Sequence, residues 1–162
     1  SDLSGLMLFP KHRQAAAWLS ELFRQGALHK RYLALVTGTP ADNQWSANGA
    51  IGKVGSARWG VIAEGRQALT DFSLLAAADG RALLEAHPRT GRTHQIRVHL
   101  AAGGLPIVGD TTYAGSPAAR LMLHCIGLDF ESRNGVQLEL EAPADDTFAG
   151  ICGNCWPATA PG

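Results

Sequence analysis

The segment HPRTGRTHQIRVHLAAGG, residues 87–104, decides the fold that this chain can adopt. Pro88 and Gly91 mark a turn near its beginning. The residues after the turn predict a helix over 94–102, with Thr93 as its N-cap, and the two glycines that follow end it. The segment therefore predicts a turn that leads directly into the N-terminus of a helix.

Basic and hydroxyl side chains are concentrated in this turn and at the start of the helix. They are Arg89, Thr90, Arg92, Thr93 and Arg97. A helix N-terminus presents free backbone N–H groups, so such side chains suit a phosphate or another anion, although a solvated basic turn fits the local pattern as well. Arg97 lies one turn into the helix, where its guanidinium can reach back and bind a carboxylate through two hydrogen bonds.

Strands and one further helix surround this segment. Apolar residues at 6–9 predict a strand, and apolar residues at helical spacing over 15–23 predict a helix that ends at Gly26. Further strands are predicted at 30–36, 58–64, 68–76, 82–87, 121–130 and 136–141, and residues 43–56 have the composition of a loop with short strands. Together these elements predict an α+β domain built on a mixed, mainly antiparallel sheet.

Length and composition set further bounds. The 162 residues suit one domain, to which we assign residues 1–149, and residues 150–162 have the Gly, Pro and Ala content of a C-terminal tail. The 14 basic and 14 acidic residues balance, yet the first 66 residues hold eight basic and four acidic ones, which allows a locally basic surface. The chain has neither a long apolar run nor a signal peptide, so we expect a cytoplasmic protein without a membrane partner.

Histidine and cysteine positions raise metal and redox hypotheses. The histidines concerned are His87, His94, His99 and His124. His94 and His99 are five residues apart, whereas zinc ligands on one helix face are four apart, so we predict no metal site. Cys152 and Cys155 have the spacing of a zinc or redox pair, but no second pair accompanies them, which favours reduced thiols without a chemical role.

Several segments resemble one known family. The signature of the RluA-like RNA pseudouridine synthases is similar to HPRTGRTHQIRVHLAAGGLPIVGDTTYAG, residues 87–115. The family's Lys-x-Tyr-x-Ala-x-Val-x-Gly strand is similar to LHKRYLALVTG, residues 28–38. Two more segments, SGLMLFPK at 4–11 and RLMLHCIGLDF at 120–130, agree in order and spacing. The resemblance extends to about residue 149.

The resemblance implies an enzyme that isomerises a uridine in structured ribosomal or transfer RNA. The N1–C1′ bond breaks, the uracil turns and it is rejoined through C5, after the base has been flipped out of its stack, and neither a metal nor an organic cofactor takes part. Tyr32 would be the active-site tyrosine, and Arg97 would pair with the catalytic aspartate. The expected RNA-binding residues are Lys30, Arg31, Arg89, Arg92, Thr93, His94 and Gln95. From the residues alone, Tyr32 could be a core aromatic and Asp110 a turn residue.

The resemblance also bears on the nucleophile. In the family it is the aspartate of a His-Arg-Leu-Asp motif, four residues before a serine that corresponds to Ser4 here, which is the position just before Ser1. Asp2 matches a variable position and does not inherit the role. We therefore expect a catalytic domain that begins just after its nucleophile and is inactive as given. We also expect a monomer that binds RNA but not DNA. The alternative is a non-catalytic RNA-binding remnant of the same fold.

Overall fold

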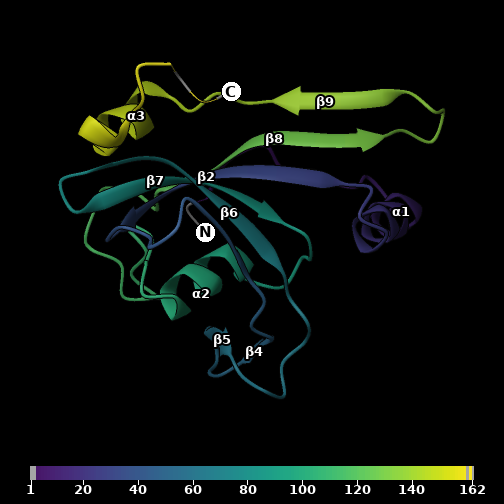
Figure 1. Ribbon diagram of the computed structural model, residues 1–162. Coiled ribbons are helices and arrows are strands. Elements are labelled where there is room, and N and C mark those ends of the chain that lie inside the picture. The colour runs from purple at the N-terminus through teal and green to yellow at the C-terminus, as the bar shows by residue number, and fades with distance from the viewer. Residues whose placement is uncertain (1–2, 160, 162) are drawn as a thin grey trace.

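A mainly antiparallel sheet forms the centre of the computed structural model, which describes residues 3–159 and 161 (Figure 1). Within the described residues its seven strands are β1 (Ser4–Gly5), β2 (His29–Thr37), β3 (Gln44–Ala47), β6 (Thr70–Ala78), β7 (Arg81–Pro88), β8 (Leu123–Glu131) and β9 (Gln137–Glu141). The order is β1-β8-β2-β7-β6-β3, and β9 also pairs with β8. Among the described strands of this sheet, only β1 runs parallel to its neighbour. The predicted α+β fold class is confirmed.

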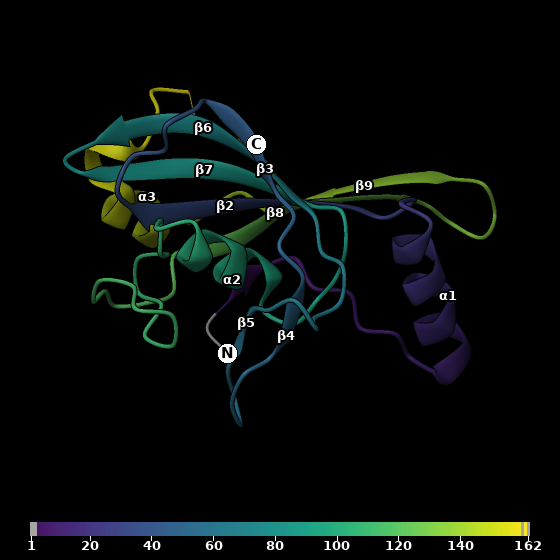
Figure 2. The same ribbon diagram turned by 60° about the horizontal axis from the view of Figure 1, so that its bottom comes forward.

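Helices cover the sheet unequally. The helix α2 (Gln95–Ala102) lies on one face and α3 (Asp146–Cys152) on the other, as Figure 1 shows. The helix α1 (Arg13–Arg24) lies apart from both, beside the far end of the sheet (Figure 2), and none of its residues is fully buried. Within the described chain, no helix combines the length and the apolar character that crossing a membrane requires.

A small second sheet lies next to α2. It consists of β4 (Ile51–Lys53) and β5 (Trp59–Val61), which pair antiparallel. Ile51 packs there with Val98 of α2 and with the buried Tyr113. This cluster holds α2 from the side opposite the main sheet, so the helix is fixed between two sheets.

Strand β2 is the most deeply buried part of the molecule. Leu33, Ala34, Leu35 and Val36 are completely shielded from solvent, because β7 and β8 pair with both edges of β2 and helices cover both of its faces. The first residues of β2, which include Lys30 and Tyr32, are only partly buried. The strand therefore runs from a groove at its beginning into the core.

The apolar run at residues 6–9 is not a strand. Only Ser4–Gly5 pairs with β8, and Leu6 makes one last hydrogen bond, from its N–H to the Cys125 carbonyl, at 3.1 Å. A Cβ atom at Gly5 would lie 2.2 Å from that carbonyl oxygen, so β1 can approach β8 only with glycine there. Beyond Leu6 the chain leaves the sheet, which leaves the Phe9 side chain 76% exposed.

The start of α2 also differs from what the sequence predicted. The helix begins at Gln95, and its N-cap is His94, whose backbone is left-handed with φ +54° and whose side chain makes no capping hydrogen bond. Thr93 is exposed and does not cap the helix, so that prediction is wrong. The tight left-handed residue turns the chain from the basic loop, residues 89–92, into α2 and takes the place of the extended N-cap that threonine would have supplied.

Residues 150–155, at the beginning of the expected tail, are not loose, because α3 continues to Cys152 and the 3₁₀ turn Gly153–Cys155 follows it. Asp145 caps α3 by accepting a hydrogen bond from the Phe148 N–H at 2.8 Å. Phe148, Cys152 and Cys155 are buried in the main core. The Gly and Pro content of this segment predicted a tail because these residues are common in flexible chain. Three apolar side chains, Phe148, Cys152 and Cys155, instead pack into the core and hold the segment on the sheet.

The buried C-terminal segment should therefore contribute strongly to stability. We expect Phe148→Ala to lower the free energy of unfolding by about 3–5 kcal/mol, because it removes a fully buried aromatic ring. Urea denaturation followed by circular dichroism measures the change. The matched control is Phe9→Ala, which removes the same ring from an exposed position and should change the free energy by less than about 0.5 kcal/mol. Equal effects would contradict the core placement of Phe148.

Candidate functional site

A groove opens where β2 leaves the core. It consists of two adjoining pockets, with volumes of about 760 and 220 Å³. The residues that line both pockets, and therefore join them into one groove, are Leu3, Phe23, Lys30, Tyr32, Thr90, Gly91 and Arg92. We refer to the two parts as the large pocket and the small pocket.

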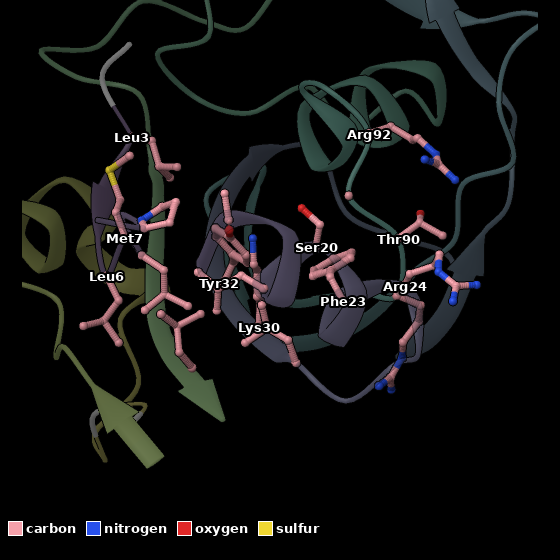
Figure 3. Close-up of a pocket in the computed structure, with 18 of the residues that line it drawn as sticks. Leu3, Leu6, Met7, Ser20, Phe23, Arg24, Lys30, Tyr32, Thr90 and Arg92 are labelled. Carbon is pink, nitrogen blue, oxygen red and sulfur yellow. The ribbon is translucent and has the colours of Figure 1, made fainter. Parts of the chain in front are cut away.

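The walls of the groove come from four parts of the chain. Figure 3 shows Lys30 and Tyr32 of β2 between the N-terminal segment, which includes Leu3, and the basic loop, which includes Arg92. The helix α1 contributes Phe23 to the same groove. A Cβ atom at Gly91 would lie 3.0 Å from the Phe23 ring, so the absence of a side chain at Gly91 lets the basic loop approach α1 closely.

The groove is basic although the chain as a whole has no net charge. The basic residues that line the large pocket are Arg24, Lys30, Arg66, Arg89 and Arg92, and no acidic residue within the described chain lines it. The small pocket adds His94 and Arg97. The locally basic surface that the sequence allowed is therefore present, and it faces a cavity with many apolar walls.

Tyr32 lies at the boundary between the two pockets. It is partly buried and pairs with Cys125 of β8 and Ala86 of β7 across the sheet. Burial, with a smaller contribution from Cys125, raises the pKa of the Tyr32 hydroxyl well above its usual value. The hydroxyl thus stays protonated at neutral pH, and the ring presents an aromatic surface to the groove.

Lys30 precedes Tyr32 by two residues on the same strand. Its ammonium nitrogen lies 4.9 Å from the centre of the Phe23 ring, in a cation–π contact. Burial lowers the pKa of Lys30. The contact connects α1 to β2 through two side chains that both line the groove.

Arg97 binds a carboxylate with the two-point geometry expected from its position. Its Nε and Nη2 atoms each donate to Asp110, to Oδ2 and Oδ1, at 2.8 Å. The Asp110 side chain is completely buried and the Arg97 side chain is 16% exposed. Asp110 therefore fixes the guanidinium at the wall of the small pocket, a role that goes beyond the turn residue it suggested in the sequence.

The side chain of Gln95 connects the basic loop to residues 69 and 70 through hydrogen bonds. Its buried side-chain oxygen accepts hydrogen bonds from the Thr90 hydroxyl at 2.6 Å and from the Arg92 N–H at 3.0 Å. Its amide nitrogen donates to the Leu69 carbonyl and to the Thr70 hydroxyl oxygen, both at 2.9 Å. Gln95 lines the small pocket, but these four bonds engage its side chain in shaping the basic loop.

The remaining residues predicted to bind RNA are distributed unevenly. Arg92 lines both pockets, and its Nε donates to the Gln67 carbonyl at 2.7 Å. Arg89 lines the large pocket and forms an ion pair with Asp71 at 2.7 Å. Thr93 is exposed and does not line either pocket.

Arg31 is directed elsewhere. It lines a third pocket of about 280 Å³, whose walls include the acidic residues Asp129, Glu139 and Glu141. It pairs with Glu85 at 3.7 Å and with Glu141 at 3.6 Å. Lys30 also lines this third pocket, whereas Tyr32 does not, and Arg31 lines neither part of the groove.

The histidines and cysteines do not assemble into a metal centre among the described residues, where no group of three potential ligands is found. His99 bonds to the Thr70 hydroxyl and to the Gly49 carbonyl, each at 2.8 Å. His124 bonds to the Ser4 hydroxyl at 2.8 Å and to the Ala142 carbonyl at 2.6 Å. Both therefore connect segments of the fold. Asp2, considered above for the nucleophile, lies outside the described residues.

Comparison with known proteins gives a consistent result. The family model described as RNA pseudouridylate synthase matches residues 2–102. An uncharacterized RNA pseudouridine synthase of Zymomonas mobilis is 36% identical over 158 residues, which cover 93% of this chain and 72% of the relative. The ribosomal large subunit pseudouridine synthase C of Yersinia pestis is 35% identical, over 90% of this chain and 50% of the relative.

Solved structures agree on the fold. The human RNA pseudouridylate synthase domain containing 1 protein superimposes with a TM-score of 0.70 at 30% identity, covering 83% of this chain and 62% of that structure. The human RNA pseudouridylate synthase domain containing 4 protein has a TM-score of 0.72 at 22% identity, over 89% of this chain and 68% of that structure. This likeness supports the fold alone. The chain spans about half the length of most of the relatives it matches.

The buried Arg97–Asp110 pair should be sensitive to loss of either charge. We expect Asp110→Asn to lower the free energy of unfolding by about 3 kcal/mol, because it leaves the guanidinium without its buried carboxylate. Thermal and urea denaturation measure the loss. Asp42→Asn, the same change at an exposed position, serves as the control and should have little effect. A wild-type stability for Asp110→Asn would show that the pair does not hold the pocket wall.

Proposed function

The chain belongs to the RNA pseudouridylate synthase family, and from this premise we propose that it binds structured RNA in the groove and isomerises a uridine to pseudouridine. The observation that carries the proposal is the convergence of Tyr32, Arg97 and the basic loop on one cavity. A uridine inside a helix is inaccessible to such a site. The target base therefore has to be flipped out of its stack, which costs about a few kcal/mol.

In the proposed complex the flipped uracil occupies the small pocket. The ring of Tyr32 supplies a surface against which the base packs, and its protonated hydroxyl is available as a hydrogen-bond donor. Asp110 fixes Arg97 at the same wall, and Arg97 is proposed to lie opposite the reacting carboxylate. Because both side chains are held before RNA arrives, the pocket needs little rearrangement to accept the base.

The RNA backbone is proposed to follow the large pocket. Lys30, Arg66 and Arg92 provide positive charge along it, and the apolar wall around Phe23 suits unstacked bases of the neighbouring nucleotides. Ribosomal and transfer RNA are both compatible with this surface. The name of the Yersinia pestis relative favours ribosomal RNA of the large subunit as the first substrate class to test.

The nucleophile is proposed to be an aspartate of a His-Arg-Leu-Asp motif placed immediately before Ser1. Leu3 lines both pockets, and β1 is anchored through the Ser4 hydroxyl, which contacts His124 Nδ1 at 2.8 Å. Leu3 thus brings the N-terminal end of the described chain to the groove wall, and we propose that the aspartate delivers its carboxylate to Tyr32 and Arg97 from that side. A non-catalytic protein that binds RNA through the same groove is the alternative that experiment has to exclude.

Turnover tests this proposal directly. We expect a protein that carries His-Arg-Leu-Asp before Ser1 to release tritium from RNA labelled at C5 of uridine, and the 162-residue chain alone to release none. Arg97→Leu in the longer protein should abolish release while circular dichroism shows a folded protein. Asp42→Asn is the control and should retain full activity.

Other patterns of release have definite meanings. If the longer protein binds RNA without releasing tritium, the non-catalytic alternative holds. Release by the 162-residue chain would assign the nucleophile to another carboxylate, and normal release by Arg97→Leu would exclude Arg97 from the reaction.

The basic lining predicts a salt-dependent RNA affinity. We expect the logarithm of the binding constant for a ribosomal RNA fragment to fall linearly with the logarithm of salt concentration, and Arg66→Ala and Arg92→Ala each to reduce the slope by about one. Filter binding at several salt concentrations measures the slope. Lys53→Ala removes an exposed positive charge outside the groove and should leave it unchanged. If all three variants behave alike, the RNA follows another surface.

A further inference from the structure

Tyr113 and His94 form a hydrogen bond whose direction can be worked out. The His94 Nδ1 atom lies 2.7 Å from the Tyr113 hydroxyl oxygen, and the Trp59 N–H donates to the same oxygen at 3.1 Å. Within residues 3–159 and 161 the hydroxyl has no other partner. A phenol has one proton, and a buried hydroxyl donates it to an acceptor where one is available. The proton therefore points to His94 Nδ1.

This direction determines the tautomer of His94. Because Nδ1 accepts a hydrogen bond, the ring proton of the neutral imidazole is on Nε2. Burial and the nearby Arg97 lower the pKa of His94, more than Asp110 opposes them, so the neutral form predominates at neutral pH. His94 thus carries one N–H donor, on the edge of the ring away from Tyr113.

The placement of His94 is unusual and rigid. Its left-handed backbone, with φ +54°, is costly for a residue with a side chain and persists where the surroundings impose it. The His94 ring meets the Tyr113 ring edge to face, with centroids 5.6 Å apart. The central guanidinium carbon of Arg97 lies 5.1 Å from the Tyr113 ring centroid, in a cation–π contact. His94 lines the small pocket together with Tyr32 and Arg97.

We propose that His94 reads the flipped base, by donating a hydrogen bond from Nε2–H to the O4 carbonyl of uracil. Tyr113 is a positioning residue that holds the required tautomer. This inference rests on the proposed function. At the equivalent position cytosine carries an amino group, which is itself a donor and would leave the Nε2–H unpaired in the pocket. His94, held in this tautomer by Tyr113, would therefore bind uridine in preference to cytidine before any chemistry takes place.

Binding measurements separate this inference from the proposed function. The probes are short oligoadenylates with a central uridine, cytidine or abasic site, and fluorescence anisotropy gives each affinity for the 162-residue chain. We expect the uridine probe to bind roughly tenfold more tightly than the cytidine probe. His94→Leu should remove this preference and leave the abasic probe unaffected. His94→Gln, which keeps an N–H donor, should restore part of it.

The outcomes differ for the two ideas. If none of the probes nor a ribosomal RNA fragment binds, the proposed function fails and the inference fails with it. If RNA binds but uridine and cytidine are equal in the wild type, or if His94→Leu keeps the preference, only the inference is overturned. Arg92→Ala provides the contrast, since loss of a phosphate contact should weaken all three probes alike.

Nuclear magnetic resonance tests the tautomer without RNA. Long-range ¹H–¹⁵N spectra of histidine-labelled protein should show the proton of His94 on Nε2, and Tyr113→Phe should produce a mixture of tautomers because the donor to Nδ1 is gone. A change limited to stability would not alter this signature. If Tyr113→Phe does not fold, the wild-type spectrum still decides, because a proton on Nδ1 would overturn the assignment.

Discussion

The site depends on one strand, β2, which is fully buried at residues 33–36 and partly open to solvent at its beginning. Strand β2 pairs with neighbours on both edges, and its residues 33–36 lose all contact with water. Burial of this kind anchors a strand in one register, because a shift by one residue would exchange its two faces. Lys30 and Tyr32 therefore emerge at a defined point and in a defined direction. The remaining groove walls are built around that point by segments that arrive from elsewhere in the chain.

Charge in this molecule is separated by the fold, since the balanced sequence would give no net attraction for a polyanion. Basic side chains line the groove, whereas Asp129, Glu139 and Glu141 gather near β9 around a separate pocket. Arg31 lies on the acidic side and pairs there. Of the two neighbouring basic residues, Lys30 lines both the groove and this acidic pocket, whereas Arg31 lines the acidic pocket and not the groove.

Local patterns predicted the elements well, and contacts between distant residues account for what they missed. Residues 32–36 alternate as a strand does, and the helix that carries Arg97 is bounded by a turn and two glycines, so both elements could be predicted from the sequence. Asp110 and Tyr113 had no such signal, because their partners Arg97 and His94 become neighbours only when the chain folds. The same applies to Gln95, which the resemblance placed among the RNA-binding residues, because its side chain bonds to Thr90 and to the backbone of Arg92 within the basic loop.

Two further misjudgements share a physical cause. An apolar run normally indicates burial in a core, yet residues 6–8 line a groove that is open to solvent. Conversely, a segment rich in Gly and Pro normally indicates a loose end, yet Phe148 and Cys152 anchor it. In both places, composition indicates how apolar or flexible a segment is. Whether the segment is buried depends instead on where the fold places its side chains relative to the sheet.

The helix α1 contributes a groove wall without being part of the core. None of its residues is fully buried, and Phe23 meets the rest of the site through Lys30 and Gly91. Elements with so little buried surface open locally at a much lower free energy than the central strands do. The groove thus has one wall of high local stability, formed by β2, and one of low local stability, formed by α1. Whatever fills it also completes the packing of α1, so that occupancy and helix stability are thermodynamically linked.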